Sequence, residues 1–121
     1  MRAAIVAVIL AASGCASGGV WPIVSRTTRG VEADVPGAMD SVERRARTAL
    51  EERGLEITRD APTDDGAGHV LEGQSSSLRV LVQIRGGGSS TMRTEVVAFR
   101  NAVEWDRTLA HELLDRIWKL G

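Results

Sequence analysis

The sequence has one cysteine, two histidines and no tyrosine among its 121 residues. Because Cys15 has no second cysteine to join, no disulfide can form within the chain, and the fold must be stabilised by its core. His69 and His111 have no further histidine or cysteine at the short intervals that zinc sites require. The sequence therefore predicts a domain that holds no metal and no cofactor.

Motifs for catalysis are also missing. Gly86-Gly87-Gly88 joins two predicted strands and lacks the Gly-Lys-Ser/Thr ending of a P-loop. Ser75-Ser76-Ser77 lacks the Gly-x-Ser-x-Gly pattern of a hydrolase. The acidic residues between Asp60 and Glu72 do not form a calcium-binding EF-hand, because Pro62 occupies the third position of that loop. We therefore expect a protein that is not an enzyme.

Neither sign of charge is in excess. The chain has 15 lysine and arginine residues against 16 aspartate and glutamate residues, which gives a net charge of -1. A nearly neutral chain has no general electrostatic attraction to nucleic acid or to anionic lipid. No nucleic-acid partner is expected.

The one long apolar run stands at the N-terminus. It covers residues 3–12 after the basic Arg2, whereas a transmembrane helix needs about 20 apolar residues. A basic start, a short apolar stretch and small residues before a cleavage point are typical of a secretory signal peptide. We expect residues 1–14 to be a signal peptide, residues 15–28 a flexible tether, and residues 29–121 a single domain.

The end of that segment, Leu10-Ala11-Ala12-Ser13-Gly14-Cys15, resembles the lipobox of bacterial lipoproteins, with Ala12 where leucine is most common. The resemblance implies that Cys15 is lipidated, that residues 1–14 are removed, and that the protein is anchored to the membrane. Ala16, which follows the cysteine in place of aspartate, implies transport to the outer membrane, with the domain facing the periplasm. Ordinary signal cleavage at the same small residues is the alternative, and it would leave a soluble periplasmic protein.

Apolar spacing predicts five strands and two amphipathic helices in the rest of the chain. The first helix covers residues 38–53, where Asp40 and Glu43 resemble a capping box and Gly54 fits the left-handed position after a helix. Asp106 is expected to cap the closing helix. The expected strands cover residues 29–35, 55–58, 69–74, 78–85 and 92–98.

The expected fold is α+β, in the order β-α-β-β-β-β-α. Since each helix has a single apolar stripe, both helices should pack on one face of an antiparallel sheet of four to five strands. This order, together with Val35-Pro36 before a helix and the helix-to-strand join at Gly54-Leu55, resembles an uncharacterised family of small bacterial lipoproteins over residues 29–119. The resemblance implies a role in protein contact rather than chemistry.

The other face of the sheet carries the candidate site. Odd-numbered residues of the hairpin over residues 78–98 should point away from the helices, with Leu81 diagonal to Val97. We expect a docking patch for an envelope protein there. Its residues are Leu81, Val97 and Phe99, edged by Arg79 and Arg93. The alternative is that the apolar residues pack beneath the segment around Trp21 or extend the core.

Two classes of function follow from these features. An interaction or structural module in envelope assembly or maintenance, anchored through Cys15, would have an open, polar-rimmed sheet face without a deep cavity. A periplasmic binder of a small ligand or lipid would instead have a sizeable apolar pocket between helices and sheet, near Trp105 or Trp118.

Overall fold

The computed structural model describes residues 24–86, 90–101 and 104–121. The expected signal peptide, Cys15, Trp21 and most of the expected tether lie outside the described residues. Within the described part of the chain, no helix is long and apolar enough to cross a membrane.

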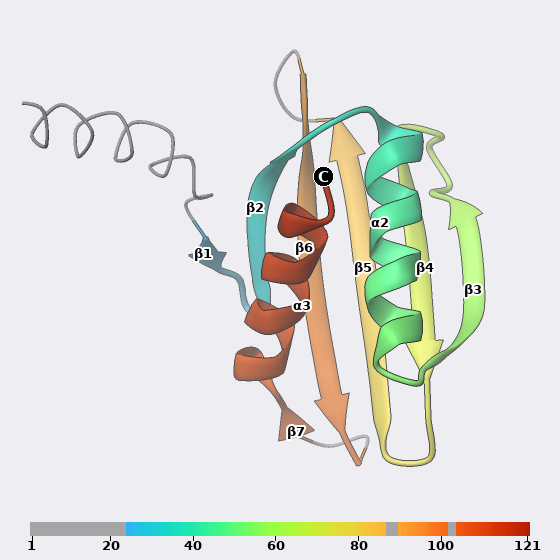
Figure 1. Ribbon diagram of the computed structural model, residues 1–121, viewed down its shortest axis with the longest axis vertical. Coiled ribbons are helices and arrows are strands. Elements are labelled where there is room, and N and C mark those ends of the chain that lie inside the picture. Colours follow the sequence, from blue (N-terminus) through green and yellow to red (C-terminus); the bar gives the residue numbers. More distant parts are fainter. Residues whose placement is uncertain (1–23, 87–89, 102–103) are drawn as a thin grey trace, which may run out of the picture.

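The described residues form an α+β fold with a seven-stranded antiparallel sheet and two helices (Figure 1). The elements in chain order are β1 (Ser25–Arg26), β2 (Val31–Pro36), α2 (Met39–Glu52), β3 (Glu56–Pro62), β4 (Gly68–Gln74), β5 (Leu78–Gly86), β6 (Thr91–Arg100), β7 (Glu104–Trp105) and α3 (Arg107–Lys119). The strands lie in the order β1-β2-β6-β5-β4-β3, and β7 pairs with β6.

The prediction of four to five strands is wrong. The five expected strands are present, and β1 and β7 are added to them. Each of the added strands has two residues, too few to show the alternation by which a strand is found in a sequence. Strand β3 is also longer than the strand expected over residues 55–58, because it continues to Pro62. An edge strand tolerates proline, since its outer N–H groups need no partner.

Both helices lie on one face of the sheet, as the sequence predicts (Figure 1). Val80, Val82 and Ile84 alternate along β5 and are fully buried on this face. They meet the apolar sides of the helices, where residues such as Leu50 and Leu113 are also buried in the same core. Burial of one such side chain contributes roughly 1.5 to 3 kcal/mol, so this single core stabilises the fold.

The helix ends differ from each other. Asp106 caps α3 as expected, because its side chain accepts a hydrogen bond of 2.9 Å from the backbone N–H of Leu109. The capping box at Asp40 is wrong: α2 begins after Ala38, which has no side-chain acceptor, and Asp40 lies within the first turn. The position of Gly54 is confirmed, since its φ is +78° and its N–H bonds back to Glu51.

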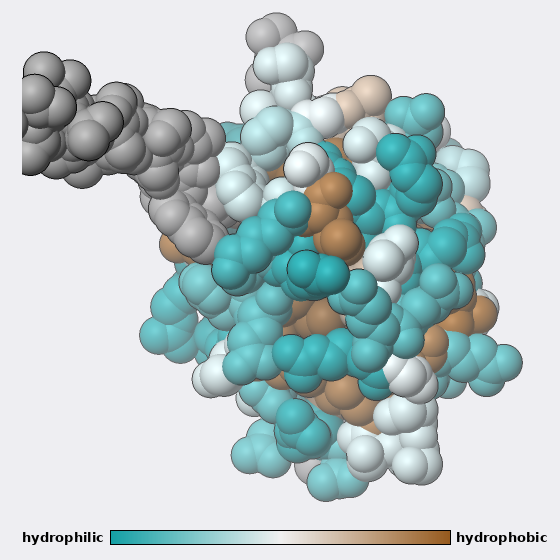
Figure 2. Space-filling view, in the orientation of Figure 1, coloured by the Kyte–Doolittle hydropathy of each residue, from teal (hydrophilic) through white to brown (hydrophobic). Residues whose placement is uncertain are grey.

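The helix side of the molecule is largely hydrophilic. Figure 2 shows polar residues over most of this face and apolar residues in the gaps between them. Arg116 donates two hydrogen bonds, of 2.8 and 2.9 Å, to Glu52 across the two helices. These exposed groups keep the surface polar and contribute little to stability, because solvent screens them.

Candidate functional site

The face of the sheet that the helices leave uncovered, here called the open face, carries the predicted patch. Side chains alternate along a strand, so residues between the buried Val80, Val82 and Ile84 point to the open face. Leu81 lies directly opposite Val97, rather than diagonal to it. The hairpin pairs Gly86 with Met92, so β6 is displaced along β5 by two residues from the expected register. A shift of two residues leaves every side chain on the face predicted for it.

The structure changes which patch residues a partner could touch. Val97 is only 1% exposed, so a partner could not touch its side chain. Leu81 and Phe99 are half-buried, and Phe99 lies opposite Arg79. Leu81, Phe99 and Arg79 are thus brought together on the open face, with the buried Val97 directly opposite Leu81.

Arg93 does not edge this group. It lies opposite Arg85, at the end of the hairpin away from Phe99. Its guanidinium donates a hydrogen bond of 2.7 Å to Glu32 and lies 3.5 Å from Asp34 on β2. The bond to Glu32 is the main reason that the pKa of Arg93 is raised. Arg93 is therefore engaged in a separate ion-pair cluster.

Trp105, which the sequence did not place in the patch, pairs with Phe99 on the open face. It is 43% exposed, and it is the one large hydrophobic residue exposed among those described. Its ring centroid lies 4.2 Å from that of Phe99, at an interplanar angle of 41°, and the guanidinium carbon of Arg29 lies 5.9 Å from the Trp105 centroid. We name Leu81, Phe99 and Trp105 the aromatic patch.

The connection between β6 and α3 fixes Trp105 in this place. Trp105 pairs with Phe99 in the short strand β7, and the N–H of Asp106 donates a hydrogen bond of 2.8 Å to the carbonyl of Ala98. The carboxylate of Asp106 also accepts from Arg100 at 2.8 Å. The backbone bond from Leu109, and then Arg100, lower the pKa of Asp106. One aspartate therefore caps the helix and holds the tryptophan against the sheet.

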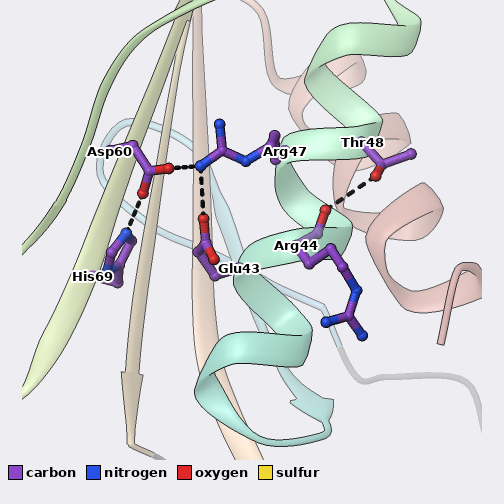
Figure 3. Close-up of polar contacts among 6 residues, drawn as sticks. All are labelled: Glu43, Arg44, Arg47, Thr48, Asp60 and His69. Atoms are coloured by element: carbon purple, nitrogen blue, oxygen red, sulfur yellow. Dashed lines mark hydrogen bonds and ion pairs between the residues drawn. The ribbon is translucent and has the colours of Figure 1, made fainter.

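A second polar cluster lies on the helix side (Figure 3). Arg47 of α2 forms a hydrogen bond of 3.0 Å with Glu43 and an ion pair with Asp60 of β3. Asp60 also contacts the imidazole of His69 on β4. The cluster joins α2 to the edge strand β3 and to its neighbour β4.

Glu43, Asp60 and His69 offer three ligand atoms within 4.8 Å of one another, a set that a divalent ion could use. However, the guanidinium of Arg47 already contacts both carboxylates and neutralises their charge. A metal would have to displace it, so the arrangement favours a structural role. Spacing in the sequence could not reveal this cluster, because its members come from three elements that only the fold brings together.

The apolar pocket expected of a ligand binder, near Trp105 or Trp118, is not found among the described residues. The space between helices and sheet is filled by fully buried side chains, such as Leu50, Val82 and Leu113. Of the most distinct hollows on the described residues, neither Trp105 nor Trp118 lines any. Trp105 is the one large hydrophobic residue exposed among those described, so the aromatic patch is the candidate contact surface.

Comparison with known proteins found no family model, no curated protein and no solved structure that matches the chain. The functional assignment must therefore be argued from the chain's own residues.

Proposed function

We propose that the chain is a lipoprotein of the bacterial cell envelope, anchored through Cys15, which contacts a protein partner through the open face of its sheet. The proposal includes removal of residues 1–14, location at the outer membrane facing the periplasm, and a role in assembly or maintenance without catalysis. Its anchor rests on the lipobox-like residues before Cys15. Its contact surface rests on the aromatic patch.

Trp105 is the single observation that carries the contact function. A half-exposed tryptophan has a large apolar area that is worth burying, and tryptophan and arginine are the residues that dominate binding energy at protein interfaces. The ring is held in place by Phe99 and Asp106, so little conformational entropy is lost when a partner covers it.

The charges around the patch define its partner. Arg29 lies over the ring of Trp105, and Arg79 lies beside Phe99. Arg79 has Glu72 as its counter-ion, whereas Arg29 has no carboxylate partner among the described residues. The patch therefore fits a protein that presents an apolar side chain flanked by acidic groups.

A photoreactive amino acid in place of Leu81, in the native host, tests this contact. We expect one specific adduct, which is lost when Trp105→Ser is added. The control places the same probe at Glu51, an exposed residue of α2 on the helix side, where no adduct is expected. The contact proposal is wrong if the Glu51 probe captures the same protein or if Trp105→Ser leaves the Leu81 adduct unchanged.

Labelling with radioactive palmitate tests the anchor separately. Cys15 supplies both the thiol and the new amino terminus that lipoproteins acylate, so Cys15→Ser should abolish incorporation and release the protein from the membrane fraction. A wild-type chain that begins near Ser17 and carries no lipid mass would contradict the anchor and support ordinary cleavage. The adduct from Leu81 can still be measured in that case.

A further inference from the structure

A hollow lies where α2 begins and α3 ends, two points that Figure 1 places side by side at one end of the molecule. Among the described residues that line it, the side chains include no aspartate or glutamate, and the backbone of Gly121 lies close to the Arg45 guanidinium. The lining residues are Ser41, Arg44, Arg45, Thr48, Leu120 and Gly121. The four from α2 follow the spacing that puts residues on one helix face.

Arg45 is the unusual member of this set. It is only 6% exposed, and no carboxylate pairs with it among the described residues. Its terminal nitrogens donate to the carbonyl oxygens of Ile117, at 3.2 Å, and of Pro36. Its Nε is buried and has no hydrogen-bond partner in the described part of the chain. A guanidinium has five N–H groups, so this buried cation still has donors to offer.

The neighbouring groups add positive charge and a second donor. Figure 3 shows Arg44 projecting from α2, and its guanidinium has no hydrogen bond or ion pair among the described residues. Thr48 donates its hydroxyl to the carbonyl of Arg44 at 3.1 Å, whereas the hydroxyl of Ser41 has no hydrogen-bond partner among the described residues. Burial lowers the pKa of Arg45, and the nearby charge of Arg44 lowers it further. An anion in the hollow would relieve both effects.

The backbone at this point also favours an anion. Helix α2 begins at Met39, and the methyl side chain of Ala38 before it cannot cap the free N–H groups of the first turn. That end of a helix carries partial positive charge. The opposite partial charge, at the end of α3, is already met by the bond from Arg45 to Ile117.

We propose that this hollow is a binding site for a phosphate-class oxyanion, held by Arg44 and Arg45 with the hydroxyl of Ser41. Planar guanidinium groups bind the oxygens of phosphate in a bidentate manner, and three donors from two turns of one helix suit a group with several oxygens. The site faces away from the aromatic patch and does not depend on it. A phosphate of this class could be free in solution or belong to a lipid headgroup.

Thermal unfolding of the full-length chain, in a neutral detergent, tests the site. Inorganic phosphate at ten times its Kd should raise Tm by roughly 5 to 10 °C relative to chloride at equal ionic strength. Arg44→Gln should abolish the rise, and Ser41→Ala should reduce it. Arg59→Gln is the matched control, because it removes one positive charge from an exposed position on β3 that does not line the hollow.

The proposal is overturned if phosphate and chloride give the same Tm, as expected if Gly121, which lies close to the Arg45 guanidinium, leaves no room for an anion. It is also overturned if Arg44→Gln keeps the rise or if acetate produces it equally. Micelles that contain phosphatidic acid distinguish the source. A rise there that depends on Arg44 identifies a lipid headgroup, and a rise with inorganic phosphate alone identifies the free ion.

Discussion

At the scale of single residues, Val97 and Trp105 show how the open face divides between stability and contact. Both were expected to bear on function, Val97 as part of a patch and Trp105 beside a pocket. Val97 is almost fully buried, whereas Trp105 is the exposed one. Alternation predicts to which face a side chain points, but not whether its neighbours cover it. Burial depends on what the rest of the fold places over a side chain, and no local pattern contains that information.

Substitution of these two residues should have opposite consequences. Val97→Ala removes two buried methyl groups and should lower the free energy of unfolding by about 1 to 2 kcal/mol while the cross-link at Leu81 persists. Trp105→Ser should abolish the cross-link at a smaller cost in stability, since nearly half of the ring is already in water. Urea unfolding measures the first effect and adduct yield the second. A large loss of stability in Trp105→Ser would assign that residue to the core instead.

Gly30 should be one of the least tolerant positions of the chain. A Cβ there would lie 2.0 Å from the carbonyl oxygen of Val96, an atom of the neighbouring strand backbone. Gly30→Ala must therefore push β2 away from β6, and we expect a loss of about 2 to 4 kcal/mol in urea unfolding. Gly86→Ala is the control, because a Cβ there meets nothing within 4 Å. Equal stability of the two variants would contradict the close approach of the strands.

At the scale of elements, α3 was the easiest part to predict and β7 the hardest. The apolar stripe of α3 and its cap at Asp106 are local, so the sequence contains both. Strand β7 depends on contacts far from the cap. The N–H of Asp106 bonds to the carbonyl of Ala98 and its carboxylate accepts from Arg100, and these bonds hold the two residues of β7 alongside β6. The sequence predicts the cap at Asp106 but not the bonds from Asp106 to β6, so the strand that holds Trp105 could not be predicted.

The cap at Asp106 should make stability depend on pH. Its pKa is lowered in the folded state, so its contribution is present above the ordinary value, near 3.9, and is lost as pH falls through the lower folded value. Asp106→Ala should cost about 1 kcal/mol at pH 7 and progressively less as pH falls below about 3.9, because the wild-type carboxyl then becomes protonated. Urea unfolding at a series of pH values tests this. A cost that does not change with pH would mean that the charge of Asp106 is unimportant.

The contact between α2 and the edge of the sheet should depend on Arg47. Without its guanidinium, the carboxylates of Glu43 and Asp60 would face each other without a shared counter-ion. Because these groups are partly exposed, we expect Arg47→Gln to cost only about 0.5 to 1 kcal/mol in urea unfolding. Arg53→Gln, on the same helix, breaks an exposed pair with Glu112 and should cost less. The reverse order would show that the cluster does not join α2 to β3.

At the scale of the whole molecule, the order of elements could be predicted and the order of strands could not. Periodicity gives both helices and the five longer strands, and one apolar stripe on each helix leaves one way to cover the sheet. The pairing of β2 with β6 joins segments about sixty residues apart, and no local pattern specifies it. The hollow at Arg45 escaped prediction for the same reason, since it needs the start of α2 beside the end of α3.

One core shared by both helices and the central strands should make unfolding cooperative over the whole domain. The buried cluster includes residues of β2, α2, β5, β6 and α3, so none of these elements can leave without exposing the others. Far-ultraviolet circular dichroism reports all helices and strands. Fluorescence of a Trp21→Phe, Trp105→Phe variant reports only Trp118, which packs against the core from α3. We expect the two signals to change at the same urea concentration. An earlier change in fluorescence would show that α3 separates first, and the α3 side of the Arg45 hollow would then open before the sheet unfolds.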